Sequence, residues 1–162
     1  MSPIRLYGAR PLSKLEAVLY AALVAVLIAV LLDRMLRLFA QAEREVVLLT
    51  LANTERGLRT QAAIAVLLSR PLPAEPQAHD PFALAGVEVR GNRGVLPQVR
   101  GDLLAPGEWA YDRQARQLVY RPRYPFGLET GEADGLLRFE VRYDPVRGQA
   151  GIVPSRPYRW EP

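Results

Sequence analysis

The sequence predicts an α+β fold in which a long N-terminal helix packs on a small antiparallel β-sheet. The first observation is the distribution of helix breakers, because residues 12–69 contain no proline and a single glycine, Gly57. The second is a change in the apolar period, from that of a helix to an alternation of two, near residue 86. We therefore predict a leader (1–11), a helix (12–69), a proline-rich connector (70–85) and an antiparallel β domain (86–162).

The first part of the predicted helix is apolar enough to cross a membrane. Residues 15–32 are 18 consecutive positions of which only Glu16 is charged, and a run of this length matches the thickness of a bilayer. The alternative is a cleaved secretory signal that ends at residues 40–42. That reading places charged side chains from residues 33–37 in the short neutral segment before the cleavage point, so the spanning helix is favoured.

After the apolar run, the same helix is predicted to continue as an amphipathic segment. No proline interrupts it before Pro71, and Gly57 costs a helix only about 1 kcal/mol. Apolar side chains recur there at spacings of four and seven, which places them on one helix face. A single helix over residues 12–69 would be about 85 Å long. The predicted packing face consists of Leu36, Ala40, Val47, Leu51, Leu58 and Ala62.

Two stretches of the C-terminal half carry clear strand patterns. The first is a hairpin over residues 109–120, with its turn at residues 112–115. The second covers residues 136–143, where apolar and charged side chains alternate. One face of this strand is predicted to be apolar and the other charged, with Leu137, Phe139, Val141 and Tyr143 on the first and Arg138, Glu140 and Arg142 on the second.

Weaker signals predict the rest of the sheet. A turn is expected at residues 91–94, and a last strand within residues 151–160 is confined to an edge by Pro154 and Pro157. A small sheet with one apolar face needs a cover. The amphipathic helix segment 46–68 is the expected cover, which gives the α+β arrangement.

The start of the apolar run resembles a known type of N-terminus. A short basic leader, a glutamate at the fifth position of "LSKLE" (residues 12–16) and an amphipathic continuation resemble type IV pilins and type II secretion pseudopilins. In that family the leader is cleaved and the glutamate pairs with a neighbouring subunit's N-terminal amine, so the resemblance implies an assembly contact at Glu16. The alternative is an interfacial residue at the start of the helix, since helix N-termini favour acids. The family has glycine where this chain has Pro11, so we expect the leader to be retained.

The sequence offers no candidate catalytic, metal-binding or cofactor-binding site. The chain has no cysteine, and its only histidine, His79, lies in the proline-rich connector. The aromatic side chains of the β domain alternate along predicted strands, as core residues do. The net charge of +4 is small, and arginines are interspersed with acids rather than gathered in a stripe. We therefore expect no enzyme activity, no cofactor, no small-molecule substrate and no nucleic-acid partner.

These features predict a non-enzymatic, single-pass inner-membrane component of a type IV pilus or type II secretion-like assembly. The resemblance implies partners among other pilin-like or pilus and secretion machinery subunits, besides the inner-membrane lipid. We expect a cytoplasmic N-terminus and a periplasmic C-terminal domain, or a domain in an extracellular filament if the leader is processed. A retained leader favours an accessory, and residues 108–123 resemble small accessories of mannose-sensitive haemagglutinin pili. The alternatives are a bitopic assembly-platform protein with a coiled-coil stalk and a small periplasmic domain, and a membrane-anchored ligand-binding domain, which would need a polar pocket.

Overall fold

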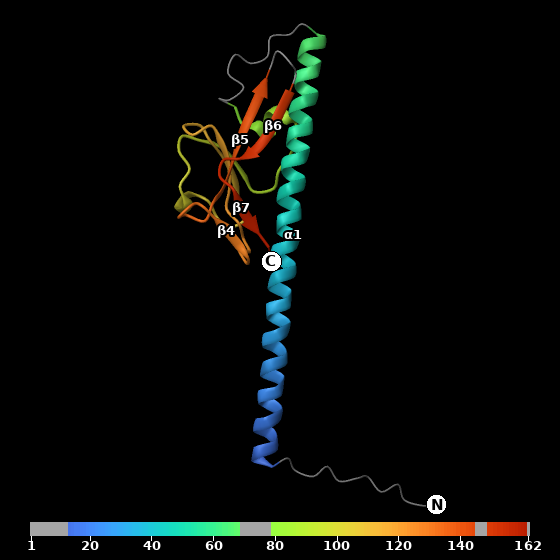
Figure 1. The fold of residues 1–162 in the computed structure, drawn as a ribbon, viewed down its shortest axis with the longest axis vertical. Helices are drawn as coiled ribbons and strands as arrows, with labels where there is room; N and C mark the ends of the chain where they lie inside the picture. Colours follow the sequence, from blue (N-terminus) through green and yellow to red (C-terminus); the bar gives the residue numbers. More distant parts are fainter. Residues whose placement is uncertain (1–12, 69–78, 145–148, 162) are drawn as a thin grey trace, which may run out of the picture. The chain divides into compact units, whose positions relative to one another are not determined.

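A computed structural model describes residues 13–68, 79–144 and 149–161 of the chain. The chain divides into two compact units, Met1–Met35 and Leu36–Pro162. The predicted α+β fold is confirmed, because a long helix packs on a small, mostly antiparallel sheet (Figure 1). The elements in chain order are α1 (Lys14–Leu67), α2 (Pro81–Ala85), β1 (Asn92–Leu96), the 3₁₀ turn η2 (Gly101–Leu103), β2 (Trp109–Asp112), β3 (Gln117–Tyr120), β4 (Leu128–Thr130), β5 (Leu137–Asp144), β6 (Gln149–Pro154) and β7 (Tyr158–Trp160).

The first unit contains the beginning of α1, residues 14–35. An 18-residue window of α1 is long and apolar enough to cross a membrane, and none of that window is buried against protein. Large apolar side chains such as Leu19, Leu23 and Leu27 are exposed there. The helix predicted over residues 12–69 is therefore present from Lys14 to Leu67, and its two predicted ends lie outside the described residues.

The second unit holds a five-stranded sheet in the order β1-β2-β3-β5-β6 and a two-stranded sheet of β4 and β7. The predicted hairpin is confirmed as β2 and β3, in which Trp109 pairs with Tyr120. The pairings β3–β5 and β5–β6 are also antiparallel, whereas β1 pairs parallel with β2. The domain is therefore not purely antiparallel, because the chain crosses over through residues 97–108 before it enters β2.

Two details of the predicted sheet were wrong. The turn expected at residues 91–94 lies earlier, since the Asn92 N–H donates to the carbonyl of Val89 at 3.2 Å and β1 begins at Asn92. The last strand is two strands, because proline lacks the N–H that a central strand needs and Pro157 separates β6 from β7. The predicted edge position is confirmed for β6, which is the last strand of the five-stranded sheet. Strand β4 was not predicted.

The predicted proline-rich connector, residues 70–85, ends in a short helix. Asp80 caps α2 by accepting a hydrogen bond from the Phe82 N–H at 3.0 Å, and Pro81 occupies the first turn, where its missing N–H is not needed. Gly86 ends the helix in the left-handed conformation at φ 68°. Residues 69–78 of the predicted connector lie outside the described residues.

The sheet carries apolar packing on both faces, which corrects the expectation of one apolar and one charged face. The main core between α1 and the sheet contains Val47, Phe82, Trp109, Tyr111, Leu118, Tyr120, Leu137, Phe139 and Trp160. A second core on the opposite face contains Val99, Leu104, Ala110, Val119 and Leu136. Along β5, Leu137 and Phe139 are buried and Glu140 and Arg142 are exposed, as predicted, but Arg138 is half-buried beside Asp134. The side chain of Tyr143 lies outside the described residues.

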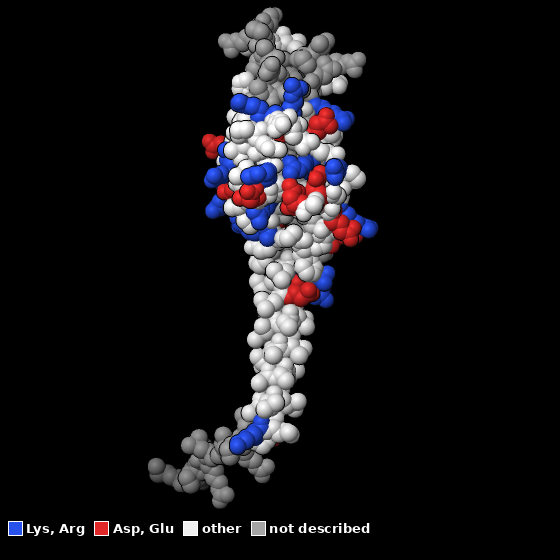
Figure 2. Space-filling view, turned by 90° about the vertical axis from the view of Figure 1, so that its left-hand side faces the viewer, with Lys and Arg blue, Asp and Glu red and all other residues white. Residues whose placement is uncertain are grey.

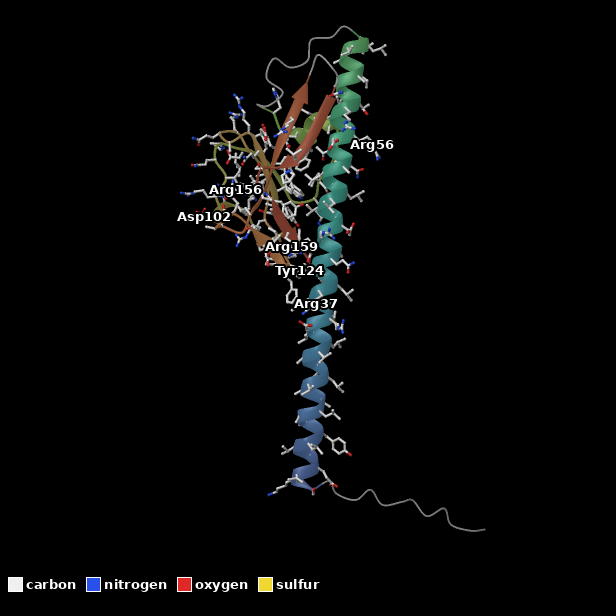
Figure 3. The ribbon with its side chains drawn as sticks, viewed as in Figure 1. Arg37, Arg56, Asp102, Tyr124, Arg156 and Arg159 are labelled. Atoms are coloured by element: carbon white, nitrogen blue, oxygen red, sulfur yellow. The ribbon has the colours of Figure 1, made fainter. Side chains whose placement is uncertain are left out.

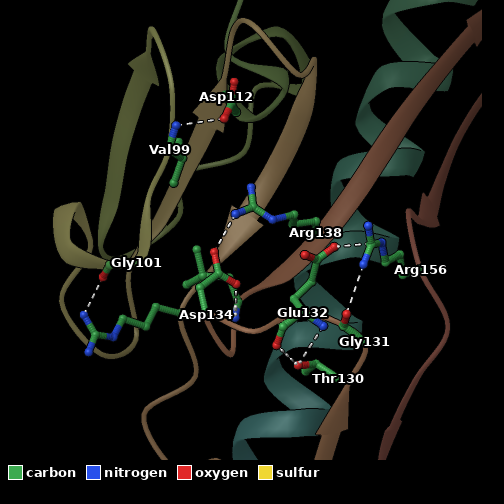
Figure 4. Close-up of polar contacts among 11 residues, drawn as sticks. Val99, Gly101, Asp112, Thr130, Gly131, Glu132, Asp134, Arg138 and Arg156 are labelled. Atoms are coloured by element: carbon green, nitrogen blue, oxygen red, sulfur yellow. Dashed lines mark hydrogen bonds and ion pairs between the residues drawn. The ribbon is translucent and has the colours of Figure 1, made fainter.

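The second core exists because the crossover segment 97–108 folds over β2 and β3. The buried Asp112 carboxylate accepts a hydrogen bond from the Val99 N–H at 2.8 Å (Figure 4). The Arg121 guanidinium donates to the carbonyls of Gly101 and Leu104 at 2.7 and 2.6 Å. Backbone groups of the crossover are thereby satisfied by side chains, as buried polar groups require.

Candidate functional site

The predicted packing face of α1 lies against the β domain over most of its length. Ala40, Val47, Leu58 and Ala62 are buried, and Leu51 is half-buried. Leu36 is 44% exposed, so the buried part of the face begins one turn later than the sequence pattern does. The buried positions hold α1 and the sheet together, and polar contacts at two levels of the helix add to them.

The first polar contact is made by Glu43, one turn before Val47. Its Oε1 accepts hydrogen bonds from the Tyr120 hydroxyl at 2.5 Å and from the Arg123 N–H at 2.6 Å. Its Oε2 accepts from the Tyr124 N–H at 2.7 Å. One half-buried carboxylate therefore satisfies two backbone donors and a phenol at the point where the chain leaves β3.

Aromatic contacts continue this attachment toward the start of the second unit. The rings of Phe39 and Tyr124 stack with centroids 5.3 Å apart. The Arg37 guanidinium lies 4.7 Å from the centroid of the Phe126 ring, within cation–π range. Figure 3 shows Arg37 and Tyr124 close together on the side of α1 that meets the β domain.

The second polar contact joins α1 to the edge strand β6. The Arg59 Nε donates to the carbonyl of Ala150 at 2.9 Å, and Glu55, which is paired with Arg59, accepts from the Ile152 N–H at 3.4 Å. An edge strand presents unpaired backbone groups that can recruit another chain. Two side chains of α1 bind such groups on β6 and cover part of that edge.

Gly57 allows α2 to approach α1 closely. A Cβ atom at this position would lie 2.8 Å from the Ala85 Cβ and closer still to the Ala85 carbonyl oxygen. A side chain there would therefore force the two helices apart. The glycine of the long helix is a packing requirement rather than a tolerated helix breaker.

A groove lies between α1 and the loops of the β domain. It has a volume of about 740 Å³, and its helix wall includes Phe39, Val46 and Asn53. The opposite wall is formed by residues 87–91 and 105–109. It is open, and it carries both acidic and basic side chains, namely Glu43, Glu88, Arg90, Glu108 and Arg123. The sequence interpretation did not find this groove, because its two walls come from segments far apart in the chain.

Glu16, the candidate assembly contact, takes part in a local structure at the start of α1. The Glu16 N–H donates to Ser13 Oγ at 3.2 Å, and the Ser13 N–H donates to Glu16 Oε2 at 2.8 Å. This reciprocal pair is a capping box, which satisfies N–H groups that lack partners at a helix start. The position of the glutamate thus has a local structural cause as well as the one that the pilin resemblance implies.

Burial and Glu43 together perturb the acidity of Tyr120. Removal from water, followed by the hydrogen bond to the Glu43 carboxylate, raises the pKa of the Tyr120 phenol far above its usual value. Burial likewise raises the pKa values of Tyr111 and Tyr158. The Tyr120 phenol therefore stays protonated and donates its hydrogen bond to Glu43.

The described residues contain no group of three His, Cys, Asp or Glu side chains that could hold a metal ion. His79 is exposed. Basic and acidic side chains are mixed over the face of the β domain that Figure 2 shows, where no stripe of one sign is seen. Comparison with models of protein families, with curated proteins and with solved structures gave no match.

Proposed function

We propose that this chain is a non-enzymatic, pilin-like structural or accessory component of a type IV pilus or type II secretion-like assembly. The observation that supports this most is the organisation of α1, a single helix of 54 residues. Its first part is apolar and exposed, and its second part is the support on which a small sheet is built. In this proposal residues 15–32 anchor the chain in the inner membrane, with the N-terminus in the cytoplasm and the β domain in the periplasm.

In this proposal the chain is an accessory protein rather than a filament subunit, because of Pro11. A proline at the position before the pilin cleavage point is unfavourable for the prepilin peptidase, so residues 1–11 remain attached. The partners are then other pilin-like or machinery subunits that contact the chain within or near the membrane. The intact mass of the membrane-extracted protein tests this: a chain that starts at Met1 is expected, a start at Leu12 would restore the filament-subunit reading, and a start at Glu43 would exclude the membrane anchor.

The role of Glu16 can be separated from its capping role by two substitutions. Glu16→Gln keeps the capping box, because glutamine also serves in that motif, but it removes the negative charge. Ser13→Ala weakens the capping box and keeps the charge.

Co-purification with the pilus or secretion complex is the measurement for both variants. An assembly contact predicts that Glu16→Gln loses the partners while Ser13→Ala keeps them. The opposite result would assign Glu16 to the helix start alone. Retention of the partners by both variants would remove Glu16 from the assembly proposal.

A further inference from the structure

The helix wall of the groove continues into a row of exposed side chains on α1. Val46, Leu49 and Leu67 are 62%, 61% and 83% exposed. With 3.6 residues per turn, the row occupies a stripe about 60° wide, centred about 130° around the helix from the buried Val47. We call this row the outer stripe; it consists of Ala42, Val46, Leu49, Asn53, Thr60, Ile64 and Leu67.

We propose that the outer stripe and the groove beside it receive α1 of a second copy of this chain, in a parallel pair related by a two-fold axis along the helices. The parallel direction rests on the proposed function, because two chains anchored by residues 15–32 enter one membrane in the same sense. The stripe spans residues 42–67, so the two helices are in contact over about 38 Å.

Asn53 favours a second copy over an unrelated helix. Its side chain is exposed, near the middle of the stripe, and carries both a donor and an acceptor. A two-fold axis places the same amide of the second copy opposite, so each donor meets an acceptor. A single asparagine at such a position is a known determinant of register between two parallel helices.

The charges on the two walls of the groove agree with this arrangement. In the two-fold arrangement, one sector of the second helix faces the loop wall of the first chain. This sector lies about 60° around the helix from the centre of the outer stripe, and it holds Glu45 and Arg56. Figure 3 shows Arg56 directed away from the β domain of its own chain. On the loop wall Glu88 follows the Ala85–Gly57 contact, which lies at the level of Arg56.

The other end of the groove shows the complementary sign. Arg123 is bound through its backbone to Glu43, so it lies at the level of Glu45. The arginine of one chain is thus placed near a glutamate of the other at both ends of the groove. Because a two-fold interface uses the same surface on both copies, it closes as a dimer and does not extend into a filament.

Disulfide trapping tests the proposal directly, since the chain has no cysteine of its own. Val46→Cys and Asn53→Cys place a thiol on the stripe, and Gln41→Cys is the matched control, exposed but about 110° from the stripe centre. The full-length variants are purified in detergent micelles, mildly oxidised and resolved without reductant. Both stripe variants are expected to give at least about tenfold more cross-linked dimer than the control, because only facing thiols come within disulfide distance.

Absence of the dimer, or equal cross-linking at residue 41, would overturn the proposal. If the groove instead binds a helix of another protein, the purified chain should stay monomeric. Sedimentation of the uncross-linked chain must show a dimer, and an open series of larger species would exclude two-fold closure. Arg56→Glu and Glu88→Arg are each expected to weaken the dimer, and the double variant to restore it.

Failure here is distinguishable from failure of the proposed function. A monomer that still co-purifies with the machinery refutes only the dimer. A dimer that binds no machinery refutes only the proposed function.

Discussion

Replacement of Glu43 should destabilise the β domain more than any other single change to a charged side chain of α1. The carboxylate accepts three hydrogen bonds, at 2.5, 2.6 and 2.7 Å, from donors that have lost part of their water. At about 1 kcal/mol each after allowance for a half-exposed site, Glu43→Ala should cost about 3 kcal/mol. Glu43→Gln should cost about 2 kcal/mol, because its amide N–H₂ faces the Tyr124 N–H, a second donor.

Tryptophan fluorescence is a suitable assay for this prediction. The two tryptophans, Trp109 and Trp160, are each only 3% exposed and lie in the main core, so their emission reports unfolding of the β domain. For a unit of this size, 1 kcal/mol corresponds to a change of about 4 °C in Tm, so decreases of about 12 °C and 8 °C are expected in micelles.

Glu45→Gln is the matched control, because the Glu45 side chain is 65% exposed and its ion pair with Arg44, at 3.7 Å, lies on the surface. Because Glu45 also takes part in the proposed dimer, the comparison is made at protein concentrations at which the chain is monomeric. There Glu45→Gln should change the free energy of unfolding by less than about 0.5 kcal/mol. If Glu43→Gln is no more destabilising than Glu45→Gln, the three hydrogen bonds do not hold α1 to the sheet. A cycle with Tyr120→Phe then isolates the coupling between the phenol and the carboxylate.

Three further predictions concern other contacts of the same unit. Gly57→Ala should lower the free energy of unfolding by about 1–3 kcal/mol through the clash with Ala85, whereas helix propensity alone predicts a gain of about 1 kcal/mol, so the sign decides between them. Because the pKa of Tyr120 is raised in the folded state, its contribution to the free energy of unfolding is complete below pH about 10. Above that pH the contribution is lost at up to about 1.4 kcal/mol per pH unit. Tyr120→Phe should therefore reduce the loss of stability at alkaline pH, as measured by urea titrations. Arg59→Met should free the Ala150 carbonyl and increase hydrogen exchange in β6, and unchanged exchange would show that the strand needs no cover.

The predictable parts of the fold are those in which local pattern and tertiary packing agree. The absence of proline predicted the long helix, and the spacing of Ala40, Val47 and Leu58 predicted residues that are buried in the structure. The β2–β3 hairpin followed from alternation alone. Helix α2 was not predicted, although Asp80 and Pro81 are helix start signals and Gly86 is a stop signal. The many prolines nearby had favoured a connector at these residues.

The rest depended on contacts between distant segments. Nothing local indicates that residues 97–108 cross over the sheet and make β1 parallel to β2. Glu43 offered a signal that could have been used, because it lies three residues after Ala40 and four before Val47, and an acid on a packing face requires donors. Which donors those are, Tyr120 and the backbone that follows it, could come only from the structure.

The contact between Arg59 and Ala150 also has a consequence for biosynthesis. It joins residues 91 positions apart, and β6 lies near the C-terminal end of the chain. At about 5–20 residues per second, the ribosome needs roughly 5–20 s after α1 is made before that partner exists. Until β2 and β3 are synthesised, the apolar face around Val47 has no sheet to cover it. The contact between α1 and β6 therefore forms last, because β6 follows the other strands of its sheet in the chain.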